Sequence, residues 1–220
     1  MKVAVVVFPG TNCDRDAVAA VAAVGHEAER LWHASSEPLS SYDAVILPGG
    51  FAHGDALRAG AIARFSAVMP HVIDFAHSGR PVLGICNGFQ VLVECGLLAG
   101  ALLRNDSLQF RSEWIHCRVE APVWGLQPGA ILRMPIAHGM GNYCPDPSAP
   151  AVEIALRYCD SSGDVSVEAN PNGSWDNVAG IASGNVFGLM PHPERAVSEL
   201  LGSTDGLYIF NALMRELVAA

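Results

Sequence analysis

Three hydrophobic runs in the N-terminal part of the chain predict strands that are buried on both faces. They span residues 3–8, 44–47 and 81–85, and valine, isoleucine, leucine and alanine make up most of them. A turn containing glycine, proline or asparagine follows each run. Such turns let the chain reverse sharply, so each strand should end on a loop.

Hydrophobic residues at helical spacing follow each of these strands. Helices are expected over residues 14–24, 59–77 and 88–98, and Pro70 should kink or divide the second one. Alternating strands and helices predict a parallel sheet with right-handed crossovers and helices on both faces. Active sites of such sheets lie beyond the carboxyl ends of the strands, where the three loops meet.

The pattern changes after Gly100. Short segments separated by glycine, proline and asparagine predict further strands, with more antiparallel pairing, at residues 115–120, 130–134, 152–158, 178–181 and 186–189. A last helix is expected over roughly 206–218. We predict an α/β fold of three layers: a mostly parallel central sheet, helices on both faces and a smaller antiparallel sheet. No linker interrupts the sequence, so residues 1–220 should form one domain.

Composition excludes several classes of function. Half of the residues are hydrophobic and 16% are charged, which is typical of a folded protein. The net charge of −9 argues against nucleic-acid and anionic-membrane binding, which need a basic face. The hydrophobic run at 3–8 is too short for a membrane span or a signal peptide, so a cytoplasmic location is expected.

The six cysteines do not suggest a disulfide framework or a metal site. The chain has no C-x-x-C pair, so zinc is not expected. Five of the six should be reduced, buried and small hydrophobic residues. The exception is Cys86.

Cys86 stands in the sequence Gly84-Ile85-Cys86-Asn87-Gly88, between a predicted strand and a predicted helix. This context is typical of a nucleophile elbow, a tight turn that lifts the central side chain clear of the sheet. The helix N-terminus would favour a thiolate, and the Asn87 N–H could hold an oxyanion. A buried cysteine flanked by glycines for packing alone is the alternative.

A thiolate needs a proton-transfer partner, and His192 is the best candidate among eight histidines. It lies in Met190-Pro191-His192-Pro193-Glu194, just after a predicted strand. In an extended segment, residues two apart point to the same side, so Glu194 could orient His192. An incidental histidine in a rigid loop is the alternative. Gly49 and Gly50, after the second strand, are candidates for binding the substrate and for a second oxyanion donor.

Together these residues resemble the class I, or triad, glutamine amidotransferases. The matching motifs are Pro48-Gly49-Gly50, Gly84 to Gly88 with Gln90, and His192-Pro193-Glu194. The resemblance implies that Cys86, His192 and Glu194 are the catalytic triad and that Gln90, four residues after the cysteine, helps bind glutamine. It also implies the flavodoxin-like fold of that family.

Further motifs resemble one group in this family, the glutaminase subunits of phosphoribosylformylglycinamidine synthases. They cover residues 8–14, 48–51, 54–55, 57–60, 83–90, 135–139, 170–174 and 190–195. Departures occur at Ala52-His53, at Met140 and within Gln109–Trp114. The resemblance implies hydrolysis of L-glutamine through a Cys86 thioester and delivery of ammonia to a large synthetase subunit, which converts formylglycinamide ribonucleotide in purine biosynthesis. A small third subunit would bridge the two.

The chain has no Gly-x-x-x-x-Gly-Lys-Ser/Thr loop and no carboxylate cluster with metal spacing. We therefore expect no metal and no cofactor on this chain, with ATP and magnesium bound by the synthetase subunit. A glutaminase serving another pathway, and a non-catalytic regulatory module on the same fold, are the alternatives that the sequence leaves open. A peptidase with a similar elbow is a further one.

Overall fold

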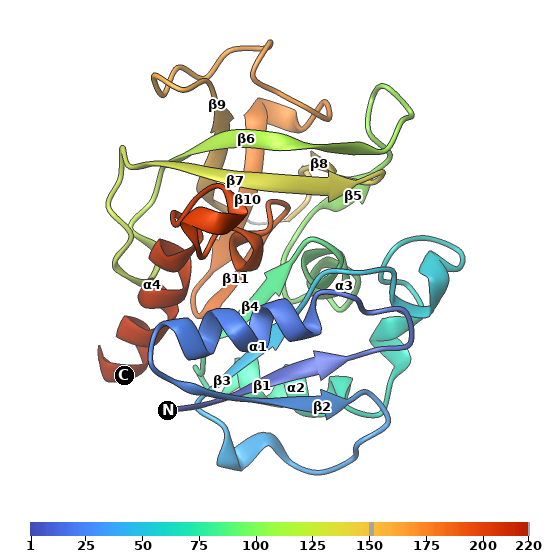
Figure 1. Ribbon diagram of the computed structural model, residues 1–220. Helices are drawn as coiled ribbons and strands as arrows, with labels where there is room; N and C mark the ends of the chain where they lie inside the picture. Colours follow the sequence, from blue (N-terminus) through green and yellow to red (C-terminus); the bar gives the residue numbers. More distant parts are fainter. Residues whose placement is uncertain (150–151, 220) are drawn as a thin grey trace.

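The computed structural model describes residues 1–149 and 152–219, and a nine-stranded sheet extends through them (Figure 1). Helices follow β1, β3 and β4 up to α3, β2 and β3 follow each other without an α-helix, and strands predominate afterwards. The strands are β1 Lys2–Val7, β2 Glu27–Trp32, β3 Ala44–Leu47, β4 Val82–Ile85, β5 Ala101–Leu103, β6 Arg111–Val119, β7 Ile131–His138, β8 Asn142–Cys144, β9 Glu153–Cys159, β10 Val178–Ser183 and β11 Val186–Leu189. The helices are α1 Asp14–Ala23, α2 Met69–His77, α3 Asn87–Glu94 and α4 Gly206–Ala219.

The order of strands in the sheet is β2-β1-β3-β4-β11-β10-β9-β6-β7. The first five of these pair in parallel, and the other four continue the same sheet with antiparallel pairing. Strands β5 and β8 form a separate antiparallel pair. The predicted mostly parallel sheet with a smaller antiparallel one is therefore confirmed. Most of the antiparallel strands extend the main sheet, because β11 returns beside β4 and leaves its other edge free for β10.

Helices cover both faces of the parallel half. Helix α1 packs on β1 and β2 and lies in front of the sheet in Figure 1, whereas α3 packs on β3, β4 and β11 behind it. In the order of the sheet, the chain moves to one side from β1 through α1 to β2 and to the other from β3 through α2 to β4, so right-handed crossovers place helices on both faces. Helix α4 packs against α1. The three predicted layers are present.

Two expectations about local structure are wrong. Strand β2 was not predicted, because it is an edge strand with three charged residues and no fully buried side chain. A helix was expected over 59–77, but only its second half is helical, as α2. The chain before α2 is irregular, and Gly60 there has a φ of 81°. Pro70 does not kink a helix; it occupies the first turn of α2, where its missing N–H costs nothing.

The prediction of one domain stays a prediction, and the continuous sheet supports it. The core lies between the sheet and the helices, and β1, β3, β4 and β11 contain its most deeply buried residues. Within residues 1–149 and 152–219, each helix is too short or too polar to cross a membrane.

Candidate active site

The chain turns sharply at Cys86, between β4 and α3. Cys86 has φ 50° and ψ −105°, a backbone conformation that residues other than glycine rarely adopt. Its N–H donates to the Leu189 carbonyl on β11, and its carbonyl accepts from the Gln90 N–H in α3. These bonds hold the strained residue in place. The local geometry is that of the predicted elbow.

The glycines on either side of Cys86 are required by space. A β-carbon on Gly88 would overlap the backbone carbonyl of Leu47 on β3. A β-carbon on Gly84 would come within 2.9 Å of the Gly88 backbone. Packing of the turn against β3 and α3 therefore explains both glycines, and that packing presents Cys86 at the carboxyl ends of the strands.

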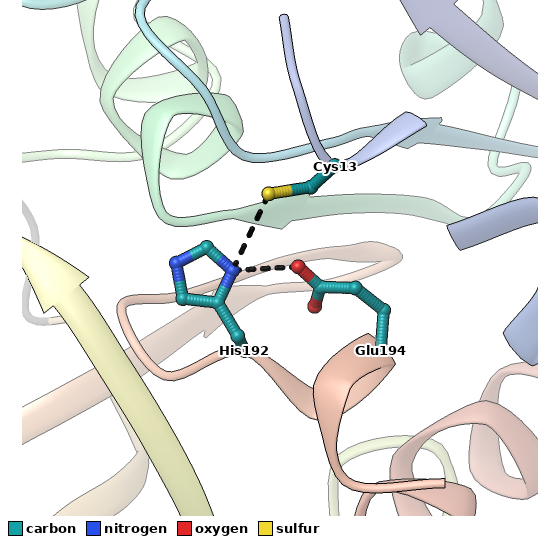
Figure 2. A group of neighbouring side chains, drawn as sticks. All are labelled: Cys13, His192 and Glu194. Carbon is teal, nitrogen blue, oxygen red and sulfur yellow. Dashed lines mark hydrogen bonds and ion pairs between the residues drawn. The ribbon is translucent and has the colours of Figure 1, made fainter. Parts of the chain in front are cut away.

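His192 and Glu194 form a buried pair beyond the end of β11 (Figure 2). The Nδ1 atom of His192 lies 2.6 Å from Oε1 of Glu194, and the side chains are 2% and 0% exposed. The expected extended segment is instead a 3-10 turn, Pro193–Arg195, that begins with proline. This turn still brings the carboxylate to the imidazole, because residues two apart in a tight turn can face each other.

The ionisation of His192 is dominated by its neighbours. Burial lowers its pKa, but the charge of Glu194 and the nearby Cys86 sulfur raise it, and the net pKa lies well above the usual value. Nδ1 is directed at Glu194, so the other ring nitrogen, Nε2, is left to exchange a proton. Among the described residues Nε2 has no hydrogen-bond partner although it is buried.

Gly49 and Gly50 follow β3 and lie against the turn at residues 10–13. Gly50 has a φ of 149°, and a β-carbon there would come within 2.8 Å of the backbone at Asn12. Within the described part of the chain, the N–H groups of Gly50 and Asn87 donate no hydrogen bond. Both remain available to a ligand, as an oxyanion site requires.

The side chains of Asn87 and Gln90 build one wall of the site. Asn87 accepts from the Ala52 N–H at 2.9 Å and donates to Asp55 at 3.1 Å and to Gln90 at 2.8 Å. Gln90 in turn donates to the carbonyl of Met140 at 2.6 Å. The sequence departures at Ala52 and Met140 therefore fall where backbone atoms make the contact. Burial raises the pKa of Asp55, opposed by the bond from Asn87.

A cavity of about 120 Å³ opens directly at Cys86. Its walls combine the predicted Gly50, Cys86 and Gln90 with residues from the antiparallel half of the sheet. Sequence reasoning did not assign the other lining residues to the site: Phe51, Asp55, Phe110, Ala137, His138, Gly139 and Met140. The motifs at 48–51, 54–55 and 135–139 contain all of them except Phe110 and Met140, so the resemblance carried a signal for the rest.

His138 is held in that wall by Asn105. The His138 Nδ1 atom lies 3.1 Å from the Asn105 side-chain oxygen, which also accepts from the Gly141 N–H. Asn105 donates to the His138 carbonyl as well, at 2.9 Å. Burial, with the charge of His192 as a second cause, lowers the pKa of His138 to about 4. His138 is therefore neutral at physiological pH.

The expectation that the other five cysteines are buried is wrong at Cys95, which is half-buried, and at Cys144. Cys144 is exposed. Cys13 is buried, but its Sγ atom lies 3.8 Å from His192 Nδ1 and accepts from Arg195 at 3.0 Å. Burial raises the pKa of the Cys13 thiol, which disfavours a thiolate at this position. All six cysteines are unpaired.

Known proteins agree with this geometry. The CobB/CobQ-like glutamine amidotransferase domain matches residues 1–205. A phosphoribosylformylglycinamidine synthase subunit PurQ from Moorella thermoacetica is 52% identical over 94% of this chain and 92% of the relative. The PurQ subunit from Chlorobaculum tepidum is 53% identical over 100% and 99%. The PurLQS structure from Thermotoga maritima matches with a TM-score of 0.86, at 42% identity over 97% of each chain.

A family match of this length and relatives of this identity leave one assignment. The chain belongs to the CobB/CobQ-like glutamine amidotransferase family, and within it to the PurQ subunits of phosphoribosylformylglycinamidine synthase.

Proposed function

We propose that this chain is the glutaminase subunit of a phosphoribosylformylglycinamidine synthase and that it releases ammonia from L-glutamine at Cys86. The observation that carries the proposal is the buried His192–Glu194 pair, whose free Nε2 is directed away from the carboxylate, close to the cysteine at the strained turn. The full-length relatives named PurQ support the same function.

Cys86 is the nucleophile in this proposal, His192 the general acid and base, and Glu194 the group that orients His192. The raised pKa of His192 favours an imidazolium next to the sulfur, and its charge stabilises a thiolate. The N–H groups of Gly50 and Asn87 are the oxyanion donors. Gly49 and Gln90 shape the glutamine site; Gln90 does so through its bonds to Asn87 and Met140.

The reaction runs in two halves. The thiolate attacks the side-chain amide carbon of glutamine, and His192 gives its proton to the leaving nitrogen, which departs as ammonia. His192 then takes a proton from water, and the hydroxide attacks the thioester to release glutamate. Proton transfer of this kind contributes about 10²–10⁴-fold in rate, and each oxyanion donor about 10²–10³-fold.

Ammonia has to be used by another active site, which we place on a large synthetase subunit that binds ATP and magnesium. The PurLQS structure combines a PurQ chain with PurL and PurS, which supports a complex of a large and a small partner with this chain. The acceptor would be formylglycinamide ribonucleotide, in the cytoplasm. No metal or cofactor on this chain takes part in the chemistry proposed here.

The test is to reconstitute the complex with Cys86→Ala and to supply either glutamine or ammonium salt. Glutamine should support no product, whereas ammonium should restore product formation at the parental rate, since the synthetase site is untouched. Cys144→Ala, at an exposed cysteine, is the matched control and should retain glutamine-dependent activity. Full glutamine-dependent turnover by Cys86→Ala would show that the nucleophile is another residue.

A further inference from the structure

Three side chains with different metal-binding atoms meet behind the proposed general base (Figure 2). Cys13 comes from the turn between β1 and α1, and His192 and Glu194 come from the segment after β11. The Cys13 Sγ atom lies 3.8 Å from His192 Nδ1, which lies 2.6 Å from Glu194 Oε1. All three ligand atoms fall within 4.8 Å of one another. Cys13 lies 179 positions before His192 in the sequence, so a search for metal ligands at short spacings did not find this cluster.

The cluster has unused binding capacity. In the described part of the chain, Oε2 of Glu194 is buried and has no hydrogen-bond partner. Glu194 is 1% exposed, and Cys13 is equally buried. His192 contacts Oε1 alone, so Oε2 leaves this buried carboxylate with an unused acceptor.

The cluster is also within reach of a ligand. A cavity of about 240 Å³ is lined by Cys13, His192 and Arg195 together with Asn12, Gly50, Phe51, Phe110 and Ala137. It adjoins the cavity at Cys86, and the two share Gly50, Phe51, Phe110 and Ala137 as lining residues. An ion could enter from this side, beside the cavity at Cys86.

Thiolate, imidazole and carboxylate form a ligand set suited to zinc. Zinc binds these groups at about 2.0–2.3 Å, so a tetrahedral site places its ligand atoms roughly 3.2–3.8 Å apart. The Cys13–His192 separation already falls in that range, and the His192–Glu194 separation would have to widen slightly. The Arg195 guanidinium, 3.0 Å from the sulfur, can keep its hydrogen bond to a metal-bound thiolate. Its positive charge would limit the affinity.

We propose that Cys13 Sγ, His192 Nδ1 and Glu194 form an inhibitory zinc site, with the fourth ligand position facing the cavity beside Arg195. Zinc would replace the proton between His192 and Glu194 and the proton of the Cys13 thiol, so binding releases two protons. The imidazole would then be fixed to the metal and lose its orienting carboxylate. This inhibitory role rests on the proposed function of His192, whereas the binding site itself does not.

The proposal predicts the kind of inhibition. Because the ion does not occupy the cavity at Cys86, zinc should lower kcat and leave KM for glutamine nearly unchanged. Zinc held by Cys86 would instead compete with glutamine and raise the apparent KM. In Cys13→Ser, the zinc concentration for half-inhibition should rise at least about 10-fold, since a thiolate ligand is lost.

The direct test uses cobalt(II) as a spectroscopic probe on the purified full-length chain. A near-ultraviolet charge-transfer band reports a cobalt–thiolate bond and needs no enzyme activity. The band should appear in the parent chain and in Cys86→Ala, and it should be lost in Cys13→Ala and Cys13→Ser. Cys95→Ala, at a half-buried cysteine, is the matched control and should keep the band.

A band that persists without Cys13, one that is lost only without Cys86, or no band at all would overturn the proposal. Labelling of Cys86 by a diazoketone analogue of glutamine shows whether each Cys13 variant retains a folded site. If the parent chain and its complex lack glutaminase activity, the function proposed above fails, while the cobalt band still decides the metal site.

Discussion

The ring of His192 packs directly against Gly49: a β-carbon built on Gly49 would lie 2.6 Å from the Cε1 atom of His192 and 3.2 Å from the Cys13 sulfur. The glycine loop therefore has a second role besides its N–H groups. It leaves room for the imidazole, which the Glu194 carboxylate holds at Nδ1. The loop after β3 and the base after β11 are packed as one unit.

Gly49→Ala should displace His192 and lower kcat of glutamine hydrolysis by roughly 10–100-fold, because displacements of about 1 Å at a reacting group have such effects. The measurement is steady-state ammonia release by the complex. Gly139→Ala is the control, since a β-carbon there meets nothing closer than the Phe110 ring at 3.8 Å. Equal losses of kcat in both variants would contradict a specific effect on His192.

Glu194→Gln should lower kcat by about 10²–10⁴-fold, because the imidazole loses the charge that orients it and stabilises its protonated form. Glu194 is the main group that raises the pKa of His192, so the limb on which activity falls with rising pH should move to lower pH. Because the pKa of His192 is higher in the folded chain than in the unfolded one, protonation of His192 also stabilises the fold. This stabilisation is complete below about pH 6.5 and is lost as the pH rises through the pKa of His192 in the folded chain. The measurement is the pH dependence of kcat. If activity of Glu194→Gln falls at the same high pH as in the parent chain, Glu194 does not set the pKa of His192.

His138 should make the fold less stable in mild acid. Its pKa of about 4 in the folded chain lies below the unfolded value of about 6.5, so the unfolded chain binds the proton more readily. The free energy of unfolding should therefore fall by up to about 3 kcal/mol as the pH drops from 6.5 to 4. Urea denaturation at pH 7 and at pH 5 measures the loss, which should shrink in His138→Gln. His77→Gln, at an exposed site, should behave as the parent chain.

Trp124 should tolerate phenylalanine far better than alanine. Its ring is 5% exposed and meets Phe187 edge-on at 5.5 Å, but within the described residues its buried indole N–H has no partner. Trp124→Phe keeps the aromatic contact and removes the unsatisfied donor, so stability should stay within about 1 kcal/mol. Trp124→Ala should cost about 3–5 kcal/mol. Urea denaturation followed by circular dichroism gives both numbers; equal losses would show that the N–H is satisfied.

Sequence reasoning works best where function imposes a local pattern. The turn at Cys86 was predicted because a buried strand, two glycines and a helix are consecutive in the chain, and each has a recognisable signature. The segment containing His192 and Glu194 was found for a similar reason, although its backbone is a turn and not an extended strand. Chemistry and spacing sufficed to pair the two residues, whatever the backbone between them.

The parts that were missed depend on tertiary contacts. Strand β2 has no continuous hydrophobic run, since it is held by pairing with β1 at the edge of the sheet. Phe110 and Met140 lie next to the paired ends of β6 and β7, and they line the cavity at Cys86 through tertiary packing that no local spacing encodes. Cys13 lies beside His192 through the packing of two loops whose positions in the sequence are 179 residues apart.

The backbone of His192 is tied to the outermost strand of the sheet: its N–H donates to the Pro135 carbonyl on β7 at 2.8 Å. Cys86 is anchored differently, through Leu189 in the middle of the sheet. The two reacting groups are thus held by different parts of one sheet, the nucleophile by its centre and the base by an edge strand. The distance between Cys86 and His192 therefore depends on the packing of β7 as well as on the turn at Cys86.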